Sequence, residues 1–267
     1  MIGSGNVATH LAIAISSIPQ HSIEAVYSPH VDHAEALAKK VGAPLFTNEL
    51  AVLPEADCYI FSVKDAFLEK TISEAKEVVP HIHEALCIHT AGSMPLSLFK
   101  GFAKGAVLYP MQTFSKEKPL DFSSVPLFIE ANTSVAFKTV ESFAHQLSQS
   151  VIPLDSERRK KLHLAAVFAN NFTNHCCALA YKLLSDNGIA PTCLLPIIDE
   201  TMRKLHSMQP LEAQTGPAVR WDENVIHMQK SLLATDPQMQ HIYEAMSQSI
   251  HHLHTTQTNT FTSPDKQ

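Results

Sequence analysis

The sequence predicts an α/β fold, with a doubly wound sheet over residues 1–153 and an all-α domain over residues 154–254. A glycine-rich turn opens the chain and leads into an apolar helical pattern. Short apolar segments of strand type then alternate with helical segments up to residue 154, and the segments beyond have helical periodicity. Residues 255–267 are polar and poor in aliphatic side chains, which predicts a disordered tail.

The opening turn fits the fingerprint G-x-G-x-x-G/A through Gly3, Gly5 and Ala8. The first glycine permits a tight strand-to-helix turn, the second lets the backbone approach a pyrophosphate, and the small third residue lets helix and strand pack closely. The helix that follows would direct its free N–H groups at phosphates. This pattern is typical of a dinucleotide-binding Rossmann domain, so we expect a cofactor at Gly3, Ser4, Gly5, Asn6 and Val7. A glycine turn without a ligand is the alternative.

Only Met1 and Ile2 precede the turn, whereas the first strand of such a domain normally contains several apolar residues. We therefore expect either a start codon placed late or a clipped chain. A missing half-strand would remove ladder hydrogen bonds and apolar burial from the centre of the sheet.

The rest of the first region can be divided by its periodicity. Strands are expected at residues 22–28, 44–47, 57–62, 86–88, 107–109, 126–131 and 151–154. Helices are expected at residues 6–18, 33–41, 134–149, 155–186, 222–233 and 237–253, with another that begins at Pro191. Gly42 stands where a glycine would end the helix before it.

The loop at residues 27–30, Tyr-Ser-Pro-His, favours NADP over NAD. An NAD site usually has an acidic residue about 20 positions after the glycines. Here no carboxylate would repel a 2′-phosphate, and Ser28 and His30 could donate to one, although no Arg or Lys is present and a plain polar loop is the alternative. Loops after later strands add the cofactor candidates Ser62, Val63, Thr90, Ala91 and Gly92.

A polar patch is expected on the long helix that follows residue 154. On an ideal helix, one face carries His163, Val167, Asn170, Asn171 and Asn174. Asparagine is unfavourable in mid-helix, so the cluster indicates a surface that faces nicotinamide and substrate. We expect His163 to relay a proton, Asn171 to orient a carbonyl or imine, and Asn174 to bind substrate. Interhelical hydrogen bonds in a dimer core are the alternative.

Further substrate contacts are expected from two loops. Residues 215–218, Thr-Gly-Pro-Ala, predict a turn that opens a helix, where Thr215 and free N–H groups could hold an anion. Arg220 could bind a carboxylate in a bidentate manner, or it could pair with Asp222 or Glu223. Gln112 could border the substrate, or it could shape the domain junction.

Composition excludes several classes of function. The net charge of −6 gives no basic footprint for nucleic acid. The five cysteines lack zinc-site spacing, which predicts free thiols in a reducing cytoplasm. No apolar run is long enough to span a bilayer. Two histidine clusters, at residues 81–83 and 251–254, lack accompanying carboxylates or cysteines, so we expect a solvated face and no metal site.

Several motifs occur together in a fixed order: the glycine turn and residues 89–93, 109–114, 161–172 and 215–220. As a set they resemble the Rossmann-like proteins that carry a C-terminal DUF2520 domain and are named as NADP oxidoreductases. The resemblance covers nearly the whole chain except the tail. The architecture is similar to a broader superfamily that includes 6-phosphogluconate, β-hydroxyacid and prephenate dehydrogenases and pyrroline-5-carboxylate reductase.

This resemblance implies an NADP-dependent oxidoreductase that acts on a small carbonyl, imine or hydroxyacid in a cleft between its domains. It also implies a homodimer formed through the helical domain. One departure matters, because β-hydroxyacid dehydrogenases place a catalytic lysine where this chain has Val167. A non-catalytic NADP-binding sensor or scaffold is therefore an alternative, and a prephenate-dehydrogenase-like enzyme is another.

Overall fold

The structure is a computed structural model and describes residues 1–261. The chain divides into two compact units, one of residues 1–173 and one that begins at Asn174. The division after residue 173 falls later in the chain than the domain boundary predicted at residue 153. The reason is that helix α5 (Ser156–Ala166) is anchored to the first unit by a buried arginine. The predicted α/β fold with a helical C-terminal region is confirmed.

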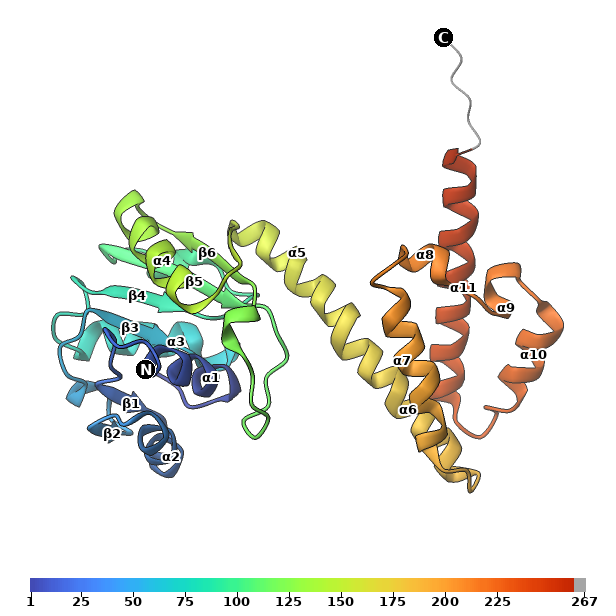
Figure 1. Cartoon of the computed structure of the whole chain (residues 1–267), viewed down its shortest axis with the longest axis horizontal. Coiled ribbons are helices and arrows are strands. Elements are labelled where there is room, and N and C mark those ends of the chain that lie inside the picture. Colours follow the sequence, from blue (N-terminus) through green and yellow to red (C-terminus); the bar gives the residue numbers. More distant parts are fainter. Residues whose placement is uncertain (262–267) are drawn as a thin grey trace, which may run out of the picture. The chain divides into compact units, whose positions relative to one another are not determined.

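The first unit contains a largely parallel sheet (Figure 1). Its strands are β1 (Ala25–Tyr27), β2 (Leu45–Thr47), β3 (Cys58–Phe61), β4 (Leu86–His89), β5 (Lys104–Pro110), β6 (Leu127–Ala131) and β7 (Val151–Pro153). Strands β1 and β2 form one parallel pair, and β3 to β7 form a five-stranded part in which only the β5–β6 pairing is antiparallel.

The two parts of the sheet are joined by the first residues of the chain. Ile2 forms parallel bridges with Tyr27 of β1 and with Phe61 of β3. Its N–H donates to Ile60 O at 2.8 Å, and its carbonyl accepts from Ser62 N at 2.7 Å. Met1 and Ile2 therefore act as a short central strand, which gives the spatial order β2-β1-(Met1-Ile2)-β3-β4-β5-β6-β7.

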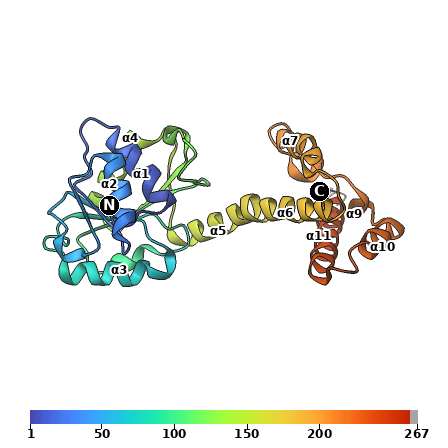
Figure 2. The same ribbon diagram turned by 90° about the horizontal axis from the view of Figure 1, so that it is seen from below.

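Helices cover both faces of this sheet (Figure 2). One face is packed by α1 (Asn6–Ser16), α2 (Val31–Val41) and α4 (Ser134–Leu147), through small and aliphatic side chains such as Leu11, Leu37 and Val140. The other face is packed by α3 (Asp65–Val78) and by the short turns η1 (Leu50–Val52) and η2 (Leu96–Phe99). A parallel sheet needs cover on both faces, and this arrangement supplies it.

The predicted helix ends agree with local chemistry at two positions. Gly42 adopts a left-handed conformation (φ 69°) directly after α2, as expected for a glycine that ends a helix. Asp155 caps α5, because its side chain accepts a hydrogen bond from the Arg158 N–H at 2.8 Å.

In the described part of the second unit, residues 174–261, the regular elements are helices. After the π-helical turn η4 (Val167–Phe172), the chain forms α6 (Thr173–Asp186), the short turn η5 (Pro191–Leu194), α7 (Leu195–Lys204), α8 (Pro210–Ala213), α9 (Pro217–Arg220), α10 (Glu223–Ser231) and α11 (Pro237–Phe261). Helix α11 continues past residue 255, where the sequence predicted a disordered tail to begin. The Thr255 and Thr256 hydroxyls bond back to carbonyls of the preceding turn, which satisfies their polar groups within the helix. Residues 262–267 lie outside the described residues.

Among residues 1–261, no helix combines the length and the apolar character that a bilayer-spanning segment requires.

Candidate functional site

Gly3 sits in a position that no other residue could occupy without strain. Its φ angle is +118°, and a Cβ atom there would lie 2.2 Å from the Ser62 carbonyl oxygen. The glycine lets the end of the central strand turn directly over the end of β3, as the fingerprint requires. Gly3 is therefore needed for the fold of the turn.

Gly5 differs from Gly3, because a Cβ at Gly5 would meet no atom within 4 Å. Gly5 is also the N-cap residue of α1, where no side chain accepts from the first N–H groups and no acidic residue occupies the first turn. Free N–H groups beside open space suit a phosphate, since the helix dipole favours negative charge there. The turn thus fits the pyrophosphate of a dinucleotide.

The remaining cofactor candidates lie at the carboxyl ends of the parallel strands, along the same edge of the sheet as the glycine turn. Ser62 follows β3, and its hydroxyl accepts a hydrogen bond from the Thr90 hydroxyl at 3.0 Å. Val63 follows Ser62, and Thr90, Ala91 and Gly92 follow β4. Ligands of open α/β sheets bind at this edge.

Ser28 and His30 lie at the end of β1, where the adenosine ribose of a dinucleotide would be expected. Ser28 is buried, and its hydroxyl accepts a long hydrogen bond from the His30 N–H at 3.4 Å. The imidazole of His30 is exposed and lies 5.3 Å from that of His33, centroid to centroid. Asp32 also lies in the first turn of α2, 3.8 Å from His33, so a carboxylate is closer to this loop than the sequence interpretation assumed.

The loop after β5 closes over the start of α1. The Asn6 side chain donates to Phe114 O at 2.8 Å, and His10 Nε2 donates to Ser115 O at 2.9 Å. The Phe114 ring packs near both the His10 ring and the Phe122 ring. Asn6 is thus a link between the glycine turn and the loop that carries Gln112 and Thr113.

Gln112 and Thr113 line an open pocket of about 410 Å³ that lies within the first unit. Tyr109, from the end of β5, and His163, from α5, face it together with Asn170 and Asn171. The Tyr109 hydroxyl lies 3.1 Å from His163 Nδ1, within hydrogen-bond distance. The structure therefore brings His163, Asn171 and Gln112 to one pocket and adds a tyrosine.

Gly92 borders this tyrosine–histidine pair. A Cβ at Gly92 would lie 2.7 Å from His163 Nδ1 and 2.8 Å from Tyr109 Cζ. The glycine therefore lets the loop after β4 come against the pair without separating its two members. Gly92 therefore shapes the pocket, and its place in the loop after a predicted strand gave no sign of this contact.

The proton of Tyr109 is held firmly in this setting. Burial raises the pKa of Tyr109 above its ordinary value, and the nearby Asp65 carboxylate raises it further, while Arg159 opposes the shift. Asp65 itself accepts a hydrogen bond from the Ser93 hydroxyl. A phenol that stays protonated at neutral pH is suited to donate a hydrogen bond or a proton.

The helix that carries His163 is not an ideal α-helix. A π-helical turn spans Val167–Phe172, between α5 and α6, and it contains Asn170 and Asn171. Such turns insert an extra residue into the helical repeat and occur often at functional sites. Asn170 and Asn171 line the pocket with Val167, whereas Asn174 is not among its lining residues and lies beyond the π-helical turn, in α6.

A buried arginine holds α5 in place. Arg159 is fully buried and donates to Glu130 Oε2 at 2.5 Å and to Met94 O at 2.6 Å. The Ser156 hydroxyl donates to the same Glu130 oxygen at 2.7 Å. Because His163 lies one turn beyond Arg159, this network fixes its position beside Tyr109.

Neither Tyr109 nor Arg159 was predicted as a site residue from the sequence. Arg159 belongs to the run Arg158-Arg159-Lys160-Lys161, whose composition is typical of a solvated helix face. Tyr109 stands at the end of a predicted strand and opens the motif at residues 109–114, but its partner lies 54 residues further along the chain.

Thr215 and Arg220, like Asn174, belong to the second unit. The turn at residues 215–218 opens α9, which has only four residues, so it offers no helix dipole to hold an anion. Within the described residues, no ion pair joins Arg220 to Asp222 or Glu223. The Asp222 side chain instead accepts from Val225 N at 3.3 Å and caps α10.

Residues 1–261 contain no group of three or more His, Cys, Asp or Glu side chains with the arrangement of a metal site.

Two family models match the chain. Residues 1–90 match the model described as NADP oxidoreductase, coenzyme F420-dependent, and residues 125–250 match DUF2520, a domain of unknown function. The second match begins before β6, so it includes the end of the sheet as well as the helices. No curated protein matches the chain.

Solved structures match over nearly the full length. A Bacteroides fragilis protein with the provisional name NADP oxidoreductase is 45% identical, with a TM-score of 0.87 over 94% of this chain and 96% of its own. A Thermotoga maritima protein is 18% identical, with a TM-score of 0.71 over 96% and 98% of the two chains. An imine reductase from Myxococcus stipitatus in complex with NADP⁺ is 15% identical, with a TM-score of 0.65 over 94% and 92%. The last two likenesses concern the fold alone.

Proposed function

This chain belongs to the family of NADP oxidoreductases that join a Rossmann domain to a C-terminal DUF2520 domain, and we propose that it transfers hydride between NADP and a small carbonyl, imine or hydroxyacid. The observation that carries the proposal is the pair of openings at the carboxyl edge of the sheet. One is the space beside Gly5 at the start of α1, and the other is the pocket that contains Tyr109 and His163.

The cofactor would be held by the glycine turn and by the loops after β1, β3 and β4. The α1 N–H groups face the pyrophosphate, while Ser28 and His30 favour a 2′-phosphate over an unmodified ribose. NAD is the less favoured cofactor for the same reason. When bound, the nicotinamide supplies or accepts the hydride.

The chain's own residues supply the proton. In the reducing direction, carbon receives hydride, and the Tyr109 hydroxyl gives its proton to the carbonyl oxygen or imine nitrogen. His163 Nδ1, 3.1 Å away, returns a proton to Tyr109 and exchanges its own with solvent. This pair replaces the lysine that related dehydrogenases place at the position of Val167.

The polar side chains around the pair orient the substrate. Asn170 and Asn171 can each present an amide donor and an acceptor to a carbonyl, an imine or a carboxylate. Gln112 lies on the opposite loop, although its side chain oxygen already accepts from Thr113 N at 2.8 Å. Asn174, Thr215 and Arg220 are proposed to contribute from the second unit.

The test is a spectrophotometric screen of NADPH oxidation against panels of small ketoacids, cyclic imines and aldehydes, with prephenate and arogenate included. We expect turnover with one of the first three classes and a clear preference for NADPH over NADH. Tight NADPH binding with no turnover across the panels would favour a non-catalytic sensor, and turnover confined to prephenate or arogenate would favour a prephenate-dehydrogenase-like enzyme.

We also propose that the protein is a homodimer formed through its helical unit. That unit has exposed apolar side chains on several helices, including Ile197, Leu205, Met228, Leu232 and Leu253. Size-exclusion chromatography with light scattering should give twice the chain mass of 29.4 kDa, and a single-chain mass at high concentration would reject the dimer.

A cytoplasmic location is proposed from the cysteines, all five of which are free in the structure. Cell fractionation tests it directly.

A further inference from the structure

Two histidine side chains face each other where the chain passes from β1 into α2. Their ring centroids lie 5.3 Å apart, with 62° between the ring planes, and both residues are exposed. His30 directly precedes α2, and His33 lies in the first turn of that helix. The sequence predicted His30 alone as a donor to a 2′-phosphate, and the structure adds a second imidazole beside it.

A carboxylate stands next to this pair. Asp32 Oδ2 lies 3.8 Å from His33 Nε2, and both side chains are more than half exposed. In Rossmann domains an acidic side chain in this region binds the ribose hydroxyls of NAD, and its charge repels a 2′-phosphate. A protonated imidazole has the opposite preference, because both of its N–H groups can donate to phosphate oxygens. The loop therefore contains groups of both preferences.

The lysines of α2 lie away from the pair. Lys39 and Lys40 belong to the last turn of the helix, and Lys39 pairs with Glu35 at 2.7 Å. At the end of β1, burial raises the pKa of Tyr27, and the Glu74 carboxylate raises it further, so this phenol is uncharged at neutral pH. Positive charge at the first turn of α2 is thus supplied by its histidines.

Strand β2 and helix α1 also pack against α2. After β2, Glu49 N donates to Thr47 Oγ1 at 2.9 Å, and Thr47 O accepts from Ser28 N at 3.0 Å. On α1, His10 is buried, and its Nε2 lies 2.9 Å from Ser115 O, so the loop after β5 occupies this imidazole. Negative charge therefore reaches the histidine pair from the first turn of α2 and from the segment after β2.

We propose that His33 is a second determinant of the cofactor preference, and that the His30–His33 pair makes the preference for NADP over NAD depend on pH. At the acidic end, the imidazolium N–H groups bind the 2′-phosphate. At the alkaline end, the neutral pair leaves Asp32 to repel that phosphate and to accept from unmodified ribose hydroxyls. The inference rests on the proposed function, because that function places the adenosine ribose after β1.

The spacing of the two rings couples proton binding to phosphate binding. Two imidazolium ions at this separation repel each other, so an anion between them is needed to keep both charged. The 2′-phosphate is a dianion above about pH 6 and can offset both charges. Histidine side chains change charge near neutral pH, so NADP should bind together with protons, whereas NAD should not.

The test uses two fragments of the cofactors, 2′,5′-ADP and 5′-AMP, which differ only in the 2′-phosphate. Their dissociation constants are measured by titration calorimetry on the full chain, between about pH 6.5 and 8.5 at constant ionic strength. We expect the preference for 2′,5′-ADP over 5′-AMP to fall about 10-fold or more across this range. Titrations at about pH 7.5 in buffers of different ionisation enthalpy should show proton uptake with 2′,5′-ADP and none with 5′-AMP.

Substitutions assign the effect to its residues. At the acidic end, His33→Gln should weaken binding of 2′,5′-ADP about 10-fold and leave that of 5′-AMP within about twofold. At the alkaline end, Asp32→Asn should strengthen binding of 2′,5′-ADP about fivefold. The matched control is His21→Gln, at a histidine that bonds to Gln146 at the amino end of the sheet, and it should follow the parent at every pH.

A preference for 2′,5′-ADP that stays constant over this range would overturn the proposal, and so would a His33→Gln variant that keeps the full pH dependence. Either result leaves the cofactor site itself standing, because 2′,5′-ADP still binds. Absence of binding by 2′,5′-ADP and NADPH at every pH would contradict the proposed cofactor site and this proposal together. No turnover is measured, so a substrate screen without a hit does not affect the result.

Discussion

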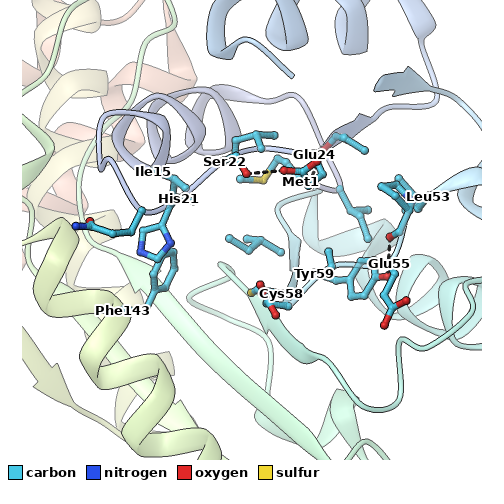
Figure 3. A pocket seen from close by; sticks show the side chains of 18 residues that line it. Met1, Ile15, His21, Ser22, Glu24, Leu53, Glu55, Cys58, Tyr59 and Phe143 are labelled. Carbon is cyan, nitrogen blue, oxygen red and sulfur yellow. Dashed lines mark hydrogen bonds between the residues drawn. The ribbon is translucent and has the colours of Figure 1, made fainter. Parts of the chain in front are cut away.

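The central strand of the first unit ends in an opening on both sides, and the two openings are built differently. At the carboxyl end, Gly5 faces open space and the first N–H groups of α1 have no side chain cap. At the amino end, the groove beside Met1 is bordered by apolar side chains such as Ile15 and Leu53 and by carboxylates such as Glu24 and Glu55. The first opening offers helix N–H groups to an anion, whereas the second (Figure 3) is bordered by strand residues and by the ends of two helices.

The difference teaches that the position of an opening on the sheet indicates a ligand site better than its size does. The groove of 350 Å³ and the Tyr109 pocket of 410 Å³ are similar in volume. Both linings contain titratable and amide side chains, but only the pocket lies at the edge where α/β sheets bind ligands. Reaction chemistry is therefore assigned to the carboxyl end of the sheet.

The two glycines of the turn give the sharpest contrast. We expect Gly3→Ala to lower the free energy of unfolding by about 4 kcal/mol, because the added Cβ clashes with the Ser62 carbonyl in a left-handed conformation. Gly5→Ala, which adds the same methyl group in open space, should leave stability nearly unchanged. Urea denaturation measures both, and equal losses would mean that the two glycines do not have separate roles.

The carboxyl-end pocket should depend on the buried arginine. Arg159→Met is expected to cost about 3 kcal/mol, because it leaves Glu130 without its partner. The control is Arg158→Met, at a neighbour whose ion pair with Asp155 lies in solvent, and it should behave like the parent. The midpoints of denaturant unfolding measure both effects. Similar losses of stability in the two variants would show that Arg159 does not anchor α5.

Tyr109→Phe separates chemistry from cofactor binding. Loss of the proton donor should lower kcat about 100-fold, whereas the dissociation constant for NADPH should remain within about twofold. The matched control is Tyr59→Phe, whose hydroxyl donates to Pro54 O at the amino end. If Tyr109→Phe retains full kcat with the best substrate of the screen, Tyr109 is not the proton donor.

The buried His89, at the carboxyl end of β4, should make the stability of the protein fall in acid. Burial, reinforced by Arg159, lowers the pKa of His89 from 6.5 to about 3. Below pH 6.5 the unfolded chain takes up this proton first, so stability falls with pH through this window. Between pH 6.5 and pH 5 the loss attributable to His89 should be about 2 kcal/mol.

His89→Leu removes this titration, so its stability should fall less steeply over the same interval than that of the parent. Thermal unfolding at matched pH values measures the two slopes, and parallel curves would contradict the buried neutral imidazole.

Local patterns in the sequence were enough to predict the fold. Interactions between residues close in the chain determine the glycine turn, the alternation of strands and helices, and the end of α2 at Gly42. The π-helical turn could not be predicted in the same way, because ideal helical spacing assumes a constant repeat. Burial of Arg159 beside Glu130 depends on pairing across 29 residues, and a basic run gives no sign of it.

The candidate site was predictable in outline. His163, Asn171 and Gln112 were singled out from residue type, and the structure places them on one pocket. The partner of His163 was not found, because the Tyr109 contact joins a strand end to a helix through tertiary packing. The sequence likewise did not show that the helix α9 is only four residues long, because its first turn resembles the start of a longer helix.

The most direct test of the account is a fluorescence titration with NADPH, and separately with NADH, of the parent protein and of Gly5→Asp. The account predicts micromolar binding of NADPH, weaker binding of NADH, and a loss of at least about 100-fold in the variant, whose carboxylate would fill the phosphate position. The thermal midpoint of the variant should not fall, because Gly5 faces open space and an aspartate at this N-cap can accept from the first N–H groups of α1. Equal NADPH affinity in parent and variant would show that the glycine turn is not the cofactor site.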